Sequence, residues 1–147
     1  MSKVVIVNAK RSAIGKFLGS LSGLSSVEIG SSVVNSLIDS SEISKSEIDE
    51  LIMGQVLTGG HGQNPARQTM MLSEIPYEKS AVTINQVCGS GLRAITIGAQ
   101  SILSGQSEIV IAGGQESMSN SHHTANIRNG IKTVSYTHLT LPTTNSV

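Results

Sequence analysis

The sequence is poor in the residues that usually anchor a core or build a metal site. Its 147 residues include no tryptophan, one phenylalanine, two tyrosines and a single cysteine, Cys88. One cysteine excludes an internal disulfide and a metal site made from several thiolates. Aromatic residues make up only 2% of the chain, so a core has to be built from aliphatic side chains and methionine.

An excess of charge of one sign and long apolar runs are missing as well. Ten basic and ten acidic residues give a formal net charge of zero, and no basic tract occurs, so we expect no nucleic-acid partner. No stretch reaches the ~18 consecutive apolar residues that a membrane-spanning helix needs. The apolar run near the N-terminus is too short for a secretory signal. We therefore expect a soluble, cytoplasmic chain of one domain without a membrane partner.

Apolar runs typical of strands alternate with segments of helical period. The strand-like runs cover residues 3–9, 51–57, 80–87 and 108–113, and the first is expected to be a buried strand. Helices are predicted at residues 27–38, 65–71 and 92–103, with a further short helix, opened by a capping-box pattern at residues 44–47, that carries Ile48 and Leu51. This alternation predicts an α/β fold with a mainly parallel sheet covered by helices.

Residues with strong capping preferences predict where the helices begin and end. Ser25 or Ser26 is expected to cap the first helix, and Asn64 followed by proline is expected to open the second. Gly105 is expected to end the third.

The alternating pattern stops after Gly114. Residues 133–147 are rich in threonine and contain no Asp, Glu, Lys or Arg, and they resemble the translated adapter tails found at the ends of fragmentary gene predictions. We therefore expect an α/β domain over residues 1–119, the beginning of a loop domain over residues 120–132, and an artefactual or disordered tail over residues 133–147.

The stretch from Asn85 to Ala94, read as strand, turn and helix, supports more than one function. Gly89, Gly91 and Ala94 spell the G-x-G-x-x-A pattern of dinucleotide-binding domains. Glu116 lies downstream near the position of the acid that binds a ribose in such domains.

The same turn also suits a nucleophile. Cys88 stands where a strand ends and a helix begins, and the backbone N–H groups and dipole at a helix N-terminus favour an anion such as a thiolate. Flanking glycines leave room for a bulky acyl group. Cys88 is alternatively a buried structural cysteine. The residues of this turn alone leave the three alternatives open.

Four separated stretches resemble the N-terminal part of the thiolases, the acetyl-CoA acetyltransferase family. They read VVIVNAKRSAIGKF near the start, GQNPARQ at 62–68, NQVCGSGLRA at 85–94 and IVIAGGQESMS at 109–119. The similarity runs from about residue 4 to about residue 132. It implies a layered thiolase-like α/β fold and, in the intact protein, a homodimer or homotetramer.

The resemblance implies that Cys88 carries the acyl group of an acyl-CoA as a thioester and passes it to a second acyl-CoA, or cleaves a 3-ketoacyl-CoA in reverse. Coenzyme A thioesters are then the substrates, with neither a metal nor a redox cofactor. The activating histidine and second cysteine of the family belong to its C-terminal half. We therefore expect this chain to be an inactive fragment of the enzyme or a non-catalytic association module. The four histidines do not match the family's histidine motif and are expected to be solvated loop residues: His61, His122, His123 and His138.

Overall fold

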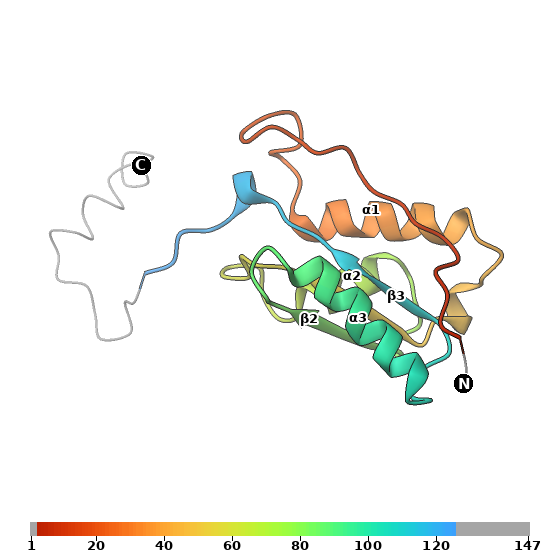
Figure 1. Ribbon diagram of the computed structural model, residues 1–147. Helices are drawn as coiled ribbons and strands as arrows, with labels where there is room; N and C mark the ends of the chain where they lie inside the picture. The colour runs from red at the N-terminus through yellow and green to blue at the C-terminus, as the bar shows by residue number, and fades with distance from the viewer. Residues whose placement is uncertain (1–2, 126–147) are drawn as a thin grey trace, which may run out of the picture.

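A computed structural model describes residues 3–125 of the chain (Figure 1). Three helices, three strands and two short 3-10 helices follow one another within these residues. In chain order they are α1 (Ser26–Asp39), η1 (Lys45–Glu47), β1 (Glu50–Gly54), α2 (Pro65–Leu72), β2 (Ser80–Ile84), α3 (Ser90–Leu103), β3 (Val110–Gly114) and η2 (Met118–Asn120).

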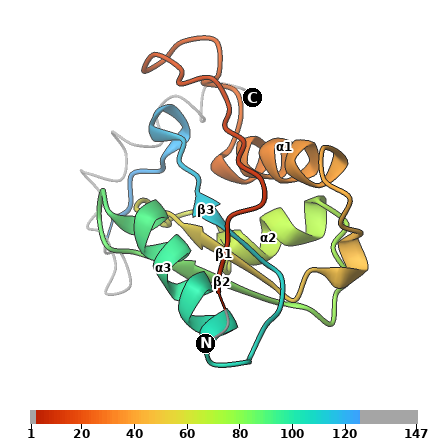
Figure 2. The same ribbon diagram turned by 45° about the vertical axis from the view of Figure 1, so that its right-hand side comes forward.

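The three strands form one parallel sheet in the order β2-β1-β3. Glu50 pairs with Ser80 and Val110 at one end, and Gly54 pairs with Ile84 and Gly114 at the other. Helix α3 lies on one face of the sheet, and α1 and α2 lie on the other (Figures 1 and 2). The predicted α/β fold with a helix-covered parallel sheet is therefore confirmed. The carboxyl ends of all three strands meet at one edge, where parallel α/β sheets usually carry their sites.

The core lies between β1 and the helices α1 and α2. It is built from aliphatic side chains and methionine, as the composition requires. Its buried members are Val34, Ile38, Ile48, Leu51, Met53, Ala66, Met70 and Ile75. Burial of these side chains fixes the central strand and with it the edge at which the strands end.

The predicted helix ends are confirmed. The Ser25 side chain accepts the N–H of Glu28 and completes a capping box at the start of α1. Asn64 caps α2 by accepting the N–H of Arg67, and Pro65 is the first helical residue. Gly105, just past the end of α3, has a φ of +75°, the left-handed conformation that favours glycine after a helix.

The buried strand predicted at residues 3–9 is wrong. No described strand pairs with this run, and Val5, Ile6 and Val7 are 68%, 77% and 74% exposed. Asn8 holds the run against the end of α1, because its Nδ2 donates to the Leu37 carbonyl and the Ser40 hydroxyl. An apolar β-branched run predicts an extended chain but cannot by itself supply a neighbouring strand.

Strands β1 and β2 end earlier than predicted, and the short helix is smaller. Strand β1 stops at Gly54 and β2 stops at Ile84, three residues before each predicted end. The capping box at Ser44 is present but opens only the single turn η1. Ile48 follows that turn and Leu51 lies in β1, so neither residue is helical. The apolar patterns identify the elements but not their ends.

Candidate active site

Cys88 lies in the turn that joins β2 to α3, at the edge where the strands end. The turn runs from Asn85 to Gly89, and Gly89 is the residue that precedes the first turn of α3. Cys88 is a free, exposed cysteine, so the alternative of a buried structural cysteine is excluded. The predicted position of Cys88 between a strand and a helix N-terminus is confirmed.

Side-chain hydrogen bonds hold this turn in a strained conformation. Val87, directly before Cys88, has a φ of +51°, which is unusual for a β-branched residue. Its N–H donates to Asn85 Oδ1 over 2.9 Å, and its carbonyl accepts the Ser90 hydroxyl over 2.6 Å. Ser90 Oγ also accepts the Gln86 N–H over 2.8 Å. Such strain persists only where surrounding contacts over-determine it, and it gathers at functional sites.

Glycines bring the first turn of α3 directly onto the strand ends. A Cβ at Gly54, the last residue of β1, would lie 2.4 Å from the carbonyl carbon of Ser90. A Cβ at Gly114 would lie 3.2 Å from the Cα of Gly91. The backbone of α3 therefore packs against the backbones of β1 and β3, and this contact fixes the height of the Cys88 turn above the sheet.

The residues that follow β1 and β3 form a buried amide pair beside this contact. Gln115 Nε2 donates to Gln55 Oε1 over 3.0 Å, and the Thr69 hydroxyl of α2 donates to Gln115 Oε1 over 2.7 Å. We did not predict this pair from the sequence, although a Gly-Gln step ends each of the two strand segments. The repeat of that step at two strand ends is the signal that could have identified it.

The Glu116 carboxylate accepts hydrogen bonds from the backbone and is therefore already engaged. It accepts the N–H of Val56 over 2.8 Å and the N–H of Leu57 over 3.4 Å. The dinucleotide hypothesis needs this acid for a ribose, and it needs Gly91 against a pyrophosphate. Here Gly91 packs against Gly114 and the carboxylate is engaged, so the geometry does not favour a nucleotide site.

Comparison with known proteins decides the family. The family described as Thiolase, N-terminal domain matches residues 4–144. The chain belongs to the thiolase family. It is 56% identical over 120 residues to an acetyl-CoA acetyltransferase of Allochromatium vinosum, covering 82% of this chain and 30% of that protein. An acetyl-CoA acetyltransferase of Paracoccus denitrificans is 49% identical over 132 residues, covering 90% of this chain and 34% of the relative.

The chain thus spans about a third of the length of the thiolase relatives that it matches. The predicted loop-domain start falls partly, and the predicted tail wholly, in residues 126–147, which lie outside the described residues. The family match extends to residue 144, past the point where we expected the similarity to stop. The tail at residues 133–147 therefore stays a prediction.

The expectation that the histidines of this thiolase segment are solvated loop residues is confirmed only in part. His122 and His123 are exposed, as predicted, and His138 lies outside the described residues. His61 is half-buried, and its ring meets that of His122 edge-on with centroids 5.4 Å apart. Within residues 3–125, no three His, Cys, Asp or Glu side chains gather closely enough to hold a metal ion. None of the helices in the same residues has the length and apolar character of a membrane span.

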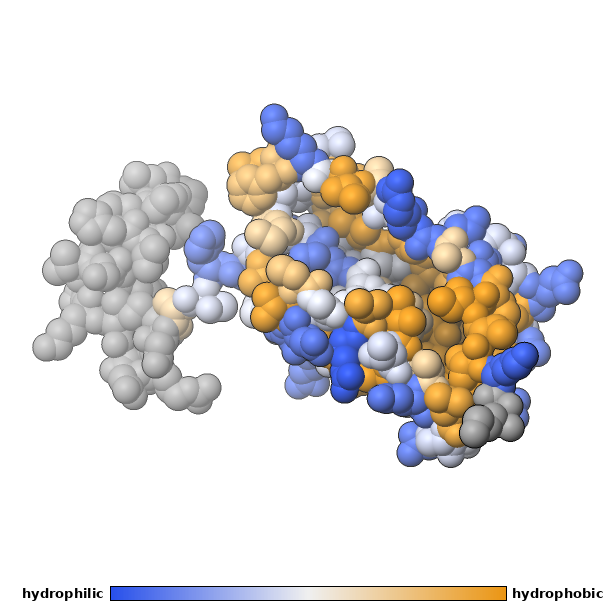
Figure 3. Space-filling view, in the orientation of Figure 1, coloured by the Kyte–Doolittle hydropathy of each residue, from blue (hydrophilic) through white to orange (hydrophobic). Residues whose placement is uncertain are grey.

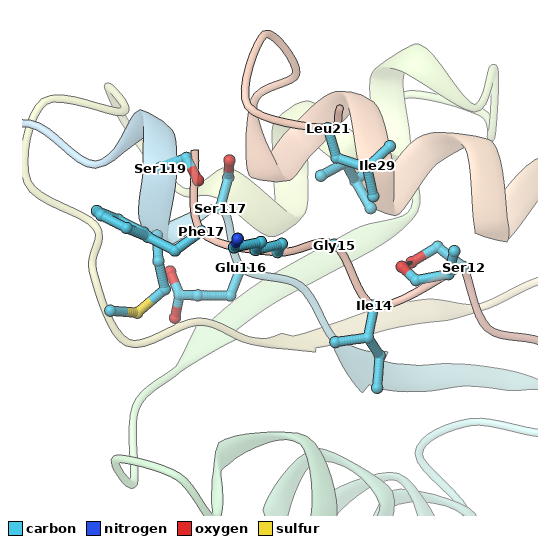
Figure 4. A pocket seen from close by; sticks show the side chains of 12 residues that line it. Ser12, Ile14, Gly15, Phe17, Leu21, Ile29, Glu116, Ser117 and Ser119 are labelled. Carbon is cyan, nitrogen blue, oxygen red and sulfur yellow. Dashed lines mark hydrogen bonds between the residues drawn. The ribbon is translucent and has the colours of Figure 1, made fainter. Parts of the chain in front are cut away.

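A cavity of about 480 Å³ opens beside η2, apart from Cys88. Its walls come from residues 12–17 and 116–119, with Leu21 and Ile29 completing it. Figure 4 shows Leu21 beside Ile29 at one end and Phe17 near Ser119 and Glu116 at the other. Cys88 is not among the lining residues, so the thiol and this cavity are separate features.

Proposed function

We propose that Cys88 is the acyl-accepting nucleophile of a thiolase that transfers acyl groups between coenzyme A thioesters. The observation that carries this proposal is an exposed thiol on a strained turn at the start of α3, in a chain of the thiolase family. The strained backbone at Val87 and the glycine contacts between α3 and the strand ends support a nucleophile that is held rigidly in place.

The first step forms a bond between Cys88 Sγ and the acyl carbon of acyl-CoA. The bond from that carbon to the coenzyme A sulfur breaks, and coenzyme A leaves as a thiolate that takes up a proton. One thioester replaces another, so the step needs neither a metal ion nor a redox cofactor. A second acyl-CoA, deprotonated at the carbon next to its carbonyl, then accepts the acyl group and frees Cys88.

The names of the relatives favour acetyl-CoA as the acyl donor. The reaction is then acetoacetyl-CoA synthesis, or thiolysis of 3-ketoacyl-CoA in fatty acid metabolism. We place it in the cytoplasm, in a homodimer or homotetramer of the full-length protein.

The 147-residue chain alone is proposed to be a poor catalyst. It covers about a third of its relatives, and its three described histidines do not lie in the family's histidine motif. Intact-mass analysis of this chain after brief incubation with acetyl-CoA should show little acetyl adduct. A prompt adduct that disappears in Cys88→Ser would contradict the proposal that the segment is inactive.

A non-catalytic association module is the second candidate function. The exposed apolar side chains of Val5, Ile6 and Val7 favour it, because such a run is typical of a surface that contacts another chain. This candidate predicts self-association that Cys88→Ser leaves unchanged, whereas the acyl-transfer proposal makes Cys88 indispensable for turnover.

The acyl-transfer proposal is tested in a chimera in which residues 1–119 replace the matching segment of the Allochromatium vinosum relative. We expect this chimera to cleave acetoacetyl-CoA and the Cys88→Ser variant to lose at least about a thousandfold in kcat. Gln100→Ala, an exposed polar change near the far end of α3, is the matched control and should retain the rate. Turnover that survives Cys88→Ser would reject the proposal.

A further inference from the structure

A path of hydrogen bonds joins Glu116, beyond the end of β3, to the turn that carries Cys88. The Glu116 carboxylate accepts the Val56 N–H over 2.8 Å. The carbonyl of Val56 accepts Asn85 Nδ2 over 3.0 Å. Asn85 Oδ1 accepts the N–H of Val87 over 2.9 Å. Each side chain in this path bonds to backbone, so the path ties three separate loops together at the carboxyl edge of the sheet.

The last link of this path acts on the strained residue. Val87 holds a φ of +51° one position before Cys88, and a β-branched residue does not keep that conformation without support. The Asn85 side chain supplies support by bonding the Val87 N–H, and the Val56 carbonyl fixes the Asn85 amide. Asn85 is exposed, so this orientation depends on its hydrogen bonds rather than on close packing.

Asp49 makes the same kind of contact at the opposite end of the sheet. Its carboxylate accepts the N–H groups of Glu108 over 2.8 Å and Ile109 over 3.2 Å. Asp49 thus joins the loops that precede β1 and β3, as Glu116 joins those that follow them. The chain therefore offers two carboxylates with equivalent local roles, of which only Glu116 is connected to the Cys88 turn.

We propose that Glu116 is a positioning residue for the thiol of Cys88, acting through Val56 and Asn85 on the backbone at Val87. The proposal rests on the proposed function of Cys88, because a nucleophile is the group that such a path would serve. Loss of the carboxylate frees Val56, lets the Asn85 amide turn away and relaxes Val87, which moves Sγ away from the N-terminus of α3.

The rate at which Cys88 is alkylated reports directly on this path, because the chain contains no other cysteine. Alkylation by iodoacetamide is measured on the 147-residue chain at fixed pH. We expect Glu116→Ala to slow alkylation about fivefold, the effect of one lost hydrogen bond of ordinary strength. Glu116→Gln keeps one acceptor oxygen for the Val56 N–H and should recover part of the rate. Asp49→Ala, the matched control, should change the rate less than twofold.

A coupling measurement separates positioning from general loosening. Asn85→Ala should slow alkylation as much as Glu116→Ala does, and the double variant should be no slower than either, because both changes break one path. The amide resonance of Val87 should shift in Glu116→Ala and stay in place in Asp49→Ala.

Several results would overturn the proposal. The first is an alkylation rate in Glu116→Ala that equals or exceeds that of the unmodified chain, or an equal slowing of alkylation by Asp49→Ala. The second is a double variant in which the effects of Glu116→Ala and Asn85→Ala on the rate add up. The third is a Val87 amide resonance that does not shift in Glu116→Ala. Alkylation requires no acyl-CoA, so these results are independent of turnover by the chimera. A chimera that turns over after Cys88→Ser would reject the role of Cys88 while leaving the measured path intact.

Discussion

Asp49 joins the loops that lead into β1 and β3, and its contacts make the stability of the sheet depend on pH. The pKa of Asp49 is lowered chiefly because its carboxylate accepts a hydrogen bond from the N–H of Glu108 and a second one from the N–H of Ile109. An ion pair with Lys79 Nζ at 3.3 Å lowers it further. A pKa that is lower in the folded chain means that the stabilisation is present above about pH 4, the usual pKa of an aspartate. It is lost as the pH falls through the lowered value.

We therefore expect Asp49→Asn to lower the free energy of unfolding at pH 7 and to have progressively less effect as the medium becomes acidic. Urea unfolding of both proteins at a series of pH values measures this difference. A destabilisation of the same size at neutral and strongly acidic pH would show that the Asp49 charge contributes nothing.

The contact between α3 and the sheet is the element-scale feature that places Cys88. A Cβ at Gly54 would overlap the backbone of Ser90 and Gly91, which cannot withdraw as the end of a flexible side chain can. We expect Gly54→Ala to cost about 1–3 kcal/mol in the free energy of unfolding, the range for overpacking. Gly113→Ala, in the neighbouring strand with no atom near its added Cβ, is the matched control and should cost much less. Thermal or urea unfolding gives both values, and equal costs would rule out this packing argument.

How well the sequence predicted each element depends on how local its determinants are. The ends of α1 and α2 were predictable because Ser25 and Asn64 act on residues three positions away. The predicted strand at residues 3–9 failed because a strand needs a neighbour that its own side chains do not specify. The position of Cys88 between a strand and a helix could be predicted from its turn. The contact between Glu116 and Val56 joins residues sixty positions apart and leaves no local pattern.

At the scale of the whole molecule, the described residues leave much apolar surface uncovered. Figure 3 shows apolar side chains gathered on the side that carries α3 and the N-terminal run. Within residues 3–125, large apolar side chains that are more than 60% exposed include Val5, Ile6, Val7, Ile14, Phe17, Leu18, Leu92 and Leu103. Exposed apolar surface of this extent is typical of an interface, and where no partner covers it the surface promotes association.

We therefore expect the 147-residue chain to self-associate or to bind a hydrophobic dye, and replacement of Val5, Ile6 and Val7 by threonine to reduce both effects. Size-exclusion chromatography with light scattering and dye fluorescence measure them. A compact, dye-negative monomer of the unmodified chain would contradict this expectation.

The central claim is that the sulfur of Cys88 carries the acyl group. Its most direct test is intact-mass analysis, with peptide mapping, of the Allochromatium chimera quenched soon after acetyl-CoA is added. We predict one acetyl group per chain on the peptide that contains Cys88, and none on that peptide in the Cys88→Ser variant. A chimera that turns over acetoacetyl-CoA while this peptide stays unmodified, or that carries its acetyl group elsewhere, would contradict the account.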